Sequence, residues 1–265
     1  MCVSVNAQKD SESEYVKAVT DISEVISKRI RHPLLRTDAF FKLSSAKMRH
    51  DQALSVLHRF TEQVVKDRRD ALDAAETTLS NYDSEIGIKK KSAFLDLLLL
   101  SEIDGQKLDN KSVREEVDTF MFEGHDTTTS GICFTLYCLS KHSDVQEKVL
   151  QEQYELFGDD RHRHPTYNEL GSMRYLEMVI RESLRLYPSV PLITRILTED
   201  TKIAGTYVPK DTNLLISIFH MQRHPSIYED PLVFKPERFD PAQRNHQNAY
   251  NWVAFSAGPR NCIGI

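Results

Sequence analysis

The feature that most constrains the fold is a proline-free stretch, 112–142, in which helix-forming and apolar residues predominate. A helix of about 30 residues rises 1.5 Å per residue and is therefore about 45 Å long, enough to cross a whole domain. Ser112 and Glu115 match a capping box, which predicts that the helix begins there. Any fold for this chain must accommodate that one long helix.

The rest of the sequence predicts helices first and a little sheet late. Apolar periodicity predicts further helices over 12–31, 45–79, 144–157 and 168–187, and a short one over 93–102. A polar segment with a lysine run, 81–92, is expected to be a loop. Alternating residues broken by Gly and Pro over 193–218 predict short strands, and proline-rich 224–245 predicts an ordered loop. The expected class is mainly α with a small β-sheet, an α+β protein.

Composition excludes several classes of protein. The net charge of −5 gives no reason to expect nucleic-acid binding. Four cysteines without a CxxC pair predict neither a disulfide framework nor a zinc site, and they favour a reducing compartment. The N-terminal segment has no apolar core typical of a signal peptide, and the apolar run at 95–100 is too short to span a bilayer.

The middle of the long helix combines apolar residues with acids. From 120 to 140 it is mostly apolar all round, which predicts burial, yet Asp118, Glu123 and Asp126 lie in or beside that stretch. A buried carboxylate without a basic partner costs several kcal/mol. The acids make a membrane span improbable, and the flanking Phe and Met residues argue against a solvent-facing acidic stripe. We therefore expect this helix to pass a reaction centre.

The spacing of these residues suggests a proton path. Thr127 follows Glu123 by four positions, so its hydroxyl can bond back to that carbonyl and open the helix locally. Gly124 removes a side chain where a ligand would approach the backbone. Asp126 beside Thr127 places an acid next to an alcohol, a pair that can relay protons inward from solvent.

A second group of charged residues predicts a structural anchor. Glu182 and Arg185 are three apart on one helix face and can pair. An exposed pair of this kind would contribute little, but the surrounding residues are apolar. Arg238 stands in a coil that needs an anchor, and one carboxylate between two guanidiniums would lock that coil to the helix. The expected role is structural rather than catalytic.

The last residues, "FSAGPRNCIGI", predict a specialised loop around Cys262. Gly258 and Pro259 favour a tight turn, Gly264 permits a close approach to something flat, and a helix start at Cys262 would favour a thiolate. One reading is a buried structural cysteine. A nucleophile would need a nearby histidine, whereas a metal thiolate needs only this protein ligand if a porphyrin supplies the rest. Arg260 could then pair with a propionate.

These residues carry a resemblance to a known family. "FSAGPRNCIG" resembles the haem-binding loop of cytochromes P-450, Phe-x-x-Gly-x-Arg-x-Cys-x-Gly, in which the fixed positions correspond to Phe255, Gly258, Arg260, Cys262 and Gly264. "ESLR" and "PERF" resemble the family's Glu-x-x-Arg motif and its arginine partner, and "EGHDTT" its oxygen-activation motif. "EVDTFMFEGHDTT" is also similar to the signature of the family 4 branch.

The resemblance implies a haem b monooxygenase. Cys262 would be the proximal thiolate, Asp126 and Thr127 would deliver protons, and Arg260 and Arg195 would bind haem propionates. Phe255, Gly258 and Gly264 would shape the cofactor loop. In family 4, the acid matching Glu123 can form an ester with a haem methyl. The reaction implied is insertion of one oxygen atom of O2 into an aliphatic C–H bond of a fatty acid or related lipid.

The resemblance also implies partners and a location. Electrons would come from an NADPH-dependent reductase, with cytochrome b5 as a second donor, at the cytosolic face of the endoplasmic reticulum membrane. The family's membrane anchor, N-terminal sheet and the helix after the cysteine have no counterpart here, so we expect a chain incomplete at both ends, with Met1 internal.

The expected organisation is one partial domain, 1–265, with a helical substrate cover at 1–110 and the haem-binding core at 111–265. Two alternatives stay open: a haem enzyme that rearranges peroxides as an isomerase or dehydratase, and a haem-free, inactive helical fragment. The pair Asp126 and Thr127 argues against the first.

Overall fold

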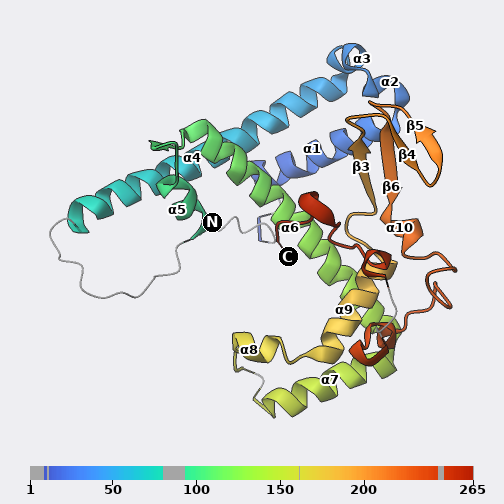
Figure 1. The fold of residues 1–265 in the computed structure, drawn as a ribbon. Helices are drawn as coiled ribbons and strands as arrows, with labels where there is room; N and C mark the ends of the chain where they lie inside the picture. The colour runs from blue at the N-terminus through green and yellow to red at the C-terminus, as the bar shows by residue number, and fades with distance from the viewer. Residues whose placement is uncertain (1–8, 11, 80–92, 161, 244–247, 265) are drawn as a thin grey trace. The chain divides into compact units, whose positions relative to one another are not determined.

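The computed structural model describes residues 9–10, 12–79, 93–160, 162–243 and 248–264, so the loop expected at 81–92 lies outside it. The described chain is mainly helical with small antiparallel sheets, which confirms the predicted class (Figure 1). It divides into two compact units, Met1–Phe122 and Glu123–Ile265. The boundary between these units falls inside the long helix, and each unit is described by itself below.

The first unit is built on two long helices and several short elements. Its elements are α1 (Glu14–Arg31), α2 (Pro33–Arg36), α3 (Asp38–Lys42), α4 (Ser45–Leu79), α5 (Phe94–Leu100), β1 (Glu102–Ile103) and β2 (Gln106–Lys107). Pro33 ends α1 as predicted but also occupies the first position of α2, where its missing N–H costs nothing. The β1–β2 hairpin was not predicted; Asp104 and Gly105 turn it with positive φ angles of 53° and 77°.

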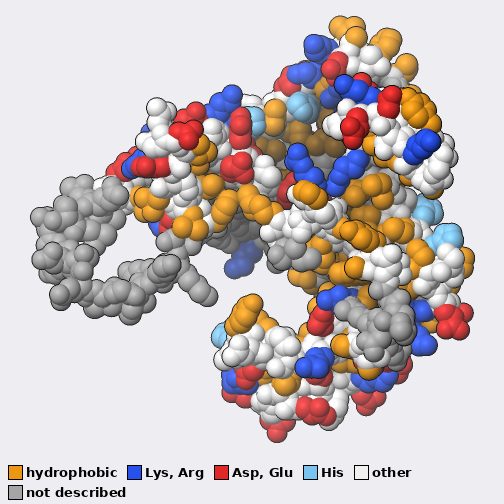
Figure 2. Space-filling model, in the orientation of Figure 1, with side chains coloured by type: hydrophobic (Ala, Val, Ile, Leu, Met, Phe, Trp, Pro, Cys, Tyr) orange, Lys and Arg blue, Asp and Glu red, His pale blue; other side chains and the backbone are white. Residues whose placement is uncertain are grey.

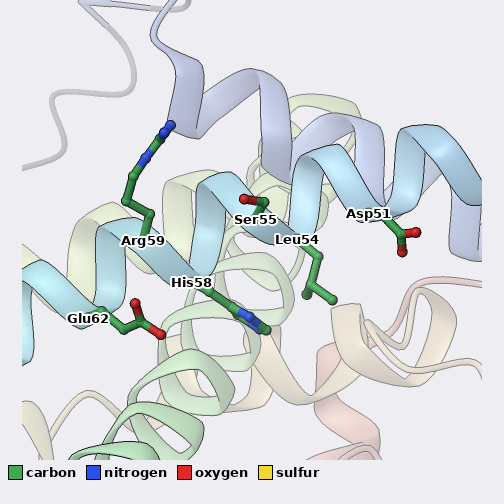
Figure 3. Close-up of a pocket in the computed structure, with 6 residues that line it drawn as sticks. All are labelled: Asp51, Leu54, Ser55, His58, Arg59 and Glu62. Atoms are coloured by element: carbon green, nitrogen blue, oxygen red, sulfur yellow. The ribbon is translucent and has the colours of Figure 1, made fainter.

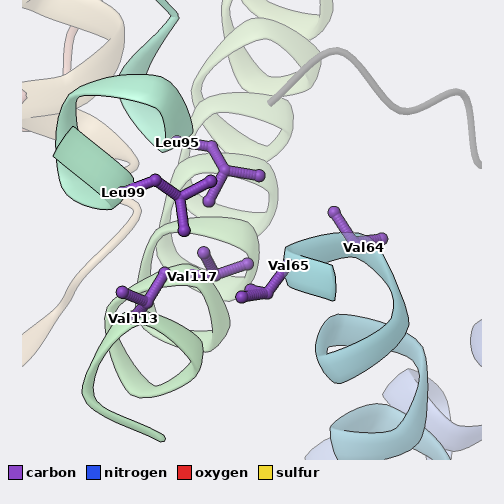
Figure 4. Close-up of a cluster of buried hydrophobic side chains, with 6 residues drawn as sticks. All are labelled: Val64, Val65, Leu95, Leu99, Val113 and Val117. Carbon is purple, nitrogen blue, oxygen red and sulfur yellow. The ribbon is translucent and has the colours of Figure 1, made fainter. Parts of the chain in front are cut away.

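The core of this unit joins α4, α5 and the start of the long helix. Six buried side chains form it, all of them valines or leucines (Figure 4): Val64, Val65, Leu95, Leu99, Val113 and Val117. α1 lies along α4 (Figure 1), and small residues such as Ala18 and Ala53 are buried between them. The amphipathic patterns read from the sequence therefore bury the faces that they predicted.

The long helix, α6 (Asn110–Lys141), begins two residues before its predicted start. Asp109 caps it, because its Oδ1 accepts the N–H of Ser112 at 2.6 Å, and this bond lowers the pKa of the Asp109 carboxyl. The capping box assigned to Ser112 and Glu115 is therefore wrong. The exposed Glu115 instead lies 3.9 Å from the exposed Lys111 and 3.8 Å from the buried Arg114 in ion pairs.

The described residues of the second unit form the further helices α7 (Ser143–Phe157), α8 (Tyr167–Leu170), α9 (Arg174–Leu186) and α10 (Ile218–Met221). Gly158 ends α7 as predicted, with φ of 64°. The single helix predicted over 168–187 is wrong: a capping box of Thr166 and Glu169 begins α8, which ends after one turn at Leu170 with Gly171 as its C-cap, and α9 begins only at Arg174. Both carboxylate oxygens of Glu152 accept N–H groups at the start of α9.

Short antiparallel strands follow α9, as the alternating pattern predicted. β3 (Leu192–Ile196) pairs with β6 (Asn213–Ser217), and β4 (Thr201–Ile203) pairs with β5 (Thr206–Val208). The proline-rich segment contains the 3₁₀ turns η1 (Pro236–Phe239) and η2 (Pro241–Gln243), and the chain beyond it contains η3 (Ala249–Asn251) and η4 (Gly258–Arg260). Within the described residues, the chain between α10 and Cys262 is coil with short 3₁₀ turns.

A hydrophobic cluster packs α7 and α9 against the second half of α6. Its buried members are Cys138, Val145, Val179, Leu186 and Phe234. Cys133 is exposed while Cys138 is buried, so the two thiols lie on different helix faces as predicted. The outer face of α7 is charged, and acidic and basic side chains gather over it in Figure 2.

Candidate functional site

A fully buried ion pair lies on α9. Neither Glu182 nor Arg185 has any exposed surface. Nε and Nη2 of Arg185 donate to the two carboxylate oxygens of Glu182 at 2.7 and 2.9 Å, which is a two-point pairing. Such a pair is stable in a dry interior only when its remaining donors are also satisfied.

Arg185 meets that requirement with backbone carbonyls. Nη1 donates to the carbonyls of Gln222 at 2.8 Å and Pro231 at 2.7 Å, and Nη2 donates to that of Val233 at 3.2 Å. Together with the two bonds to Glu182, these use all five N–H donors of the guanidinium. Arg185 therefore joins α9 to two stretches of the chain that follow the sheets.

Arg238 completes the group expected from the sequence. Its Nε lies 3.4 Å from Oε1 of Glu182, an ion-pair distance without hydrogen-bond alignment, and its Nη2 donates to the carbonyl of Asp230 at 2.7 Å. The N–H of Lys235 donates to the same Oε1 at 2.8 Å. The structure thus brings Glu182, Arg185 and Arg238 together and ties the coil at 230–238 to α9.

The middle of α6 shows the hydroxyl-to-carbonyl bond that the spacing predicted. Oγ1 of Thr127 donates to the carbonyl of Glu123 at 2.8 Å. The helix nevertheless stays α-helical throughout, so the predicted local opening is wrong, because a carbonyl has two lone pairs and can accept a second donor. The carbonyl of Thr127 in turn accepts a hydrogen bond from Oγ of Ser189 at 2.9 Å.

The predicted burial of this stretch is also wrong. Glu123, Gly124 and Asp126 are exposed, and Ile132 and Leu136 keep 57% and 60% of their surface. In the described chain, α7 and α9 cover only one face of this half of α6, which is the face with the buried Thr135 and Cys138. An all-round apolar pattern predicts burial only where neighbours surround the helix.

Asp118 is not the unpartnered acid that the sequence suggested. Its Oδ2 lies 3.6 Å from Nη1 of Arg114 and 3.7 Å from Nε2 of His58 on α4. Arg114 precedes Asp118 by one helical turn on α6. The pairing sets Asp118 apart from Glu123 and Asp126.

The loop around Cys262 is closed by its own backbone. The N–H of Cys262 donates to the carbonyl of Phe255 at 2.9 Å, and that of Asn261 to the carbonyl of Gly258 at 3.1 Å. Gly258 has a φ of 78°, a left-handed conformation that favours glycine, so the predicted tight turn is confirmed. The thiol of Cys262 is free and exposed, and a turn rather than a helix follows it within the described residues.

The two candidate propionate ligands differ in their surroundings. Arg260 is exposed and forms no ion pair within the described residues, whereas Arg195 is half-buried on β3 and donates to the carbonyl of Thr194 at 2.8 Å. No hydrogen bond or ion pair in the described chain joins the Cys262 loop to Glu123, Asp126 or Arg195. The structure therefore shows a formed loop without direct polar contacts to these candidates.

Sequence analysis missed three residues that hold the approach to this loop. They are Gln222, Tyr228 and Trp252, each of which hydrogen-bonds to backbone. Trp252 is the only tryptophan of the chain. Because their partners are carbonyl and N–H groups distant in sequence, no local pattern marks these residues.

Neither a pocket on α4 nor any metal-binding group among the described residues offers an alternative site with the predicted residues. A shallow pocket of about 430 Å³ on α4 is lined by Asp51, Leu54, Ser55, His58, Arg59 and Glu62, none of them a predicted site residue (Figure 3). In the part of the chain that the structure describes, no three His, Cys, Asp or Glu side chains group as metal ligands. A single thiolate ligand needs no such group. None of the described helices is long and apolar enough to span a bilayer.

Comparison with known proteins gives a consistent result over the whole chain. The family model "Cytochrome P450" matches residues 1–265. Cytochrome P450 4d2 of Drosophila melanogaster is 45% identical over 268 residues, covering 100% of this chain and 53% of that protein. Human cytochrome P450 4V2 is 42% identical over 262 residues, covering 98% of this chain and 50% of that protein. The chain spans about half the length of the curated relatives it matches.

Solved structures share the fold. The haem domain of cytochrome P450DA superposes with a TM-score of 0.78 at 22% identity, covering 98% of this chain and 52% of that chain. A cyanobacterial CYP120A1 with bound retinoic acid gives a TM-score of 0.76 at 26% identity, covering 97% of this chain and 53% of that chain.

Proposed function

Because the chain belongs to the cytochrome P450 family, we propose that it supplies the cysteine loop and central helix of a haem-thiolate monooxygenase. The observation that carries the proposal is the Cys262 loop, whose thiol is free and exposed while its backbone is closed on Phe255. An exposed thiol held by main-chain bonds is suited to ligation, because the ligand atom does not have to be freed from another partner.

The residues of the loop fit a haem. A Cβ on Gly264 would lie 3.8 Å from Sγ of Cys262, so a glycine there keeps the space beside the sulfur open. Arg260 offers a guanidinium without an ion-pair partner among the described residues, as a propionate ligand requires. Bound haem b would supply the iron that activates O2. Cys262 would be its protein ligand, and Arg260 and Arg195 would neutralise its propionates.

Asp126 and Thr127 would move protons to the reaction centre. The hydroxyl proton of Thr127 is directed at the carbonyl of Glu123, which leaves the lone pairs of Oγ1 available to accept a proton. Asp126 is exposed on the same helix and can exchange protons with solvent. The pair would carry protons from water to Oγ1 and onward.

The relatives support a proposal for the substrate class. Those that match over the whole chain belong to family 4, and we propose hydroxylation of an aliphatic C–H bond in a fatty acid or related lipid. An NADPH-dependent reductase, with cytochrome b5 as a second donor, would supply electrons at the endoplasmic reticulum membrane.

Isotopic labelling tests the reaction. The haem-loaded protein, a reductase, NADPH and dodecanoic acid are incubated under isotopically heavy O2, and the product is analysed by mass spectrometry. We expect one heavy oxygen in the new hydroxyl, and in Thr127→Ala more peroxide released per O2 consumed. Oxygen derived from water, or turnover of a lipid hydroperoxide without NADPH, would contradict the proposal; Thr119→Ala, which removes a similar carbonyl bond on the same helix, is the control.

Glu123 is the candidate for an ester link to a haem methyl. Glu123 is exposed, and it is its backbone carbonyl, not its carboxylate, that accepts the hydrogen bond from Thr127. We expect acid–organic solvent to leave haem on the wild-type polypeptide and to extract it from Glu123→Ala. Glu116→Ala on the same helix is the control. Free extraction of haem from the wild-type protein would rule out the ester.

A further inference from the structure

The segment 251–253, which leads into the Cys262 loop, is held by three side-chain bonds. The hydroxyl of Tyr228 donates to the carbonyl of Asn251 at 3.0 Å, and Nε1 of Trp252 donates to the carbonyl of Arg181 at 3.1 Å. The N–H of Val253 donates to Oε1 of Gln222 at 3.0 Å. Two of these bonds connect the segment to α9. Trp252 bonds directly to Arg181 on α9, and Val253 bonds to Gln222, whose amide in turn bonds to the end of α9.

Gln222 is the most committed of these side chains, since it has no exposed surface. Its Nε2 donates to the carbonyls of Leu184 at 3.1 Å and Arg185 at 3.2 Å, in the last turn of α9. Those carbonyls have no partner within the helix, and leaving them bare in the interior would be costly. With Oε1 on Val253, both amide donors and the amide oxygen of Gln222 are in use.

The backbone of Gln222 belongs to the same arrangement, because its carbonyl accepts Nη1 of Arg185. Hydrogen bonds therefore connect the buried Glu182–Arg185 pair to Gln222, and Gln222 to Val253. Two residues later, the carbonyl of Phe255 accepts the N–H of Cys262 and closes the loop. The hydrogen bonds of Arg185 to Gln222, of Val253 to Gln222 and of Cys262 to Phe255 all have ordinary lengths.

We propose that Gln222 is a positioning residue for Cys262: its buried amide ties the segment before the cysteine loop to the end of α9 and so fixes where the thiol is presented. This inference rests on the proposed role of Cys262 as the iron ligand. The side-chain hydrogen bonds of Gln222 go to Leu184, Arg185 and Val253 rather than to Cys262, so it acts through Val253 and Phe255.

The test replaces Gln222 by an apolar side chain of similar length in the haem-loaded protein. Gln222→Met is compared with Gln146→Met, an exposed glutamine on α7. Two quantities are measured: amide hydrogen exchange at Val253, and the fraction of the reduced protein with a thiolate-type carbonyl spectrum. We expect about tenfold or faster exchange in Gln222→Met, as loss of one hydrogen bond predicts, and partial loss of the thiolate-type spectrum, with both unchanged in the control.

The outcomes separate this inference from the proposed function. A wild-type protein without a thiolate-type spectrum would remove Cys262 as the ligand and the inference with it. A wild-type protein that has it, beside a folded Gln222→Met with unchanged exchange or an unchanged spectrum, would overturn the inference alone. If Gln222→Met does not fold, Gln222→Asn, which draws the amide back from Val253 by one methylene, is measured instead; a smaller change in the same direction is expected, and no change there would also overturn it.

Discussion

At the scale of single residues, Arg185 shows how much one buried guanidinium can organise. Its five donors reach a carboxylate on its own helix and three carbonyls from two later segments. A lysine has three donors on one atom and cannot form the two-point pairing with Glu182. Position 185 therefore requires the fork-shaped geometry of arginine as well as its positive charge.

We expect Arg185→Lys to lower the free energy of unfolding by about 2–4 kcal/mol, because buried carbonyls and part of a buried carboxylate lose their donors. Urea unfolding followed by circular dichroism measures the change. Arg174→Lys, at an exposed position on the same helix, should alter it by less than about 0.5 kcal/mol. Equal effects of the two substitutions would show that the guanidinium fork is not needed.

Sequence reasoning reached Glu182, Arg185 and Arg238 but not Gln222. The first two are a helical turn apart among apolar residues, and a charge in such surroundings needs an opposite charge. Gln222 has backbone partners on α9 and at Val253, more than 30 residues away on either side. An amide that serves carbonyl and N–H groups carries no charge pattern, so only the folded chain reveals it.

At the scale of elements, α4 and α5 are fastened by a charged pair as well as by their shared core. Nε and Nη2 of Arg68 donate to the two oxygens of Asp96 at 2.5 and 2.7 Å. The hydrogen bonds from Arg68 lower the pKa of the Asp96 carboxyl, and its burial only partly opposes this. Because the folded-state pKa is below the unfolded value of about 3.9, the pair stabilises the fold above about pH 4.

We expect Asp96→Asn to cost about 1 kcal/mol of stability at pH 7, a value reduced because Arg68 is partly exposed. The difference between wild type and variant should shrink as the pH falls below 4 through the folded-state pKa, since wild-type Asp96 is then protonated too. Thermal unfolding at several pH values measures this, with Asp70→Asn on the exposed side of α4 as control. A difference independent of pH would contradict the assignment.

Element boundaries were predicted correctly where one residue is the clear capping residue, and incorrectly where several neighbouring residues could cap the helix. Gly158 ends α7 through its left-handed conformation, which sequence reveals. The start of α6 was misplaced because Asp109, Ser112 and Glu115 offer competing caps, and Asp109 makes the bond. The apolar pattern at 168–187 hid a break: α8 ends at its C-cap, Gly171, and α9 begins at Arg174.

At the scale of the whole molecule, sequence order gave the class of fold, since helical periodicity ends where alternation begins at β3. Burial along α6 was not predictable in this way. The neighbouring elements decide which faces of α6 are covered. In the described chain no element covers Ile132 and Leu136, so both are exposed. The pattern states what a residue prefers, whereas exposure depends on the assembled chain.

The most direct test of the account is the carbonyl difference spectrum of the reduced, haem-loaded protein. The predicted result is a thiolate-type band in the wild type and in Cys133→Ala, whose thiol is also exposed, and its loss in Cys262→Ala. A thiolate-type band that persists in Cys262→Ala would contradict the assignment of Cys262 as the iron ligand, and with it the proposed function.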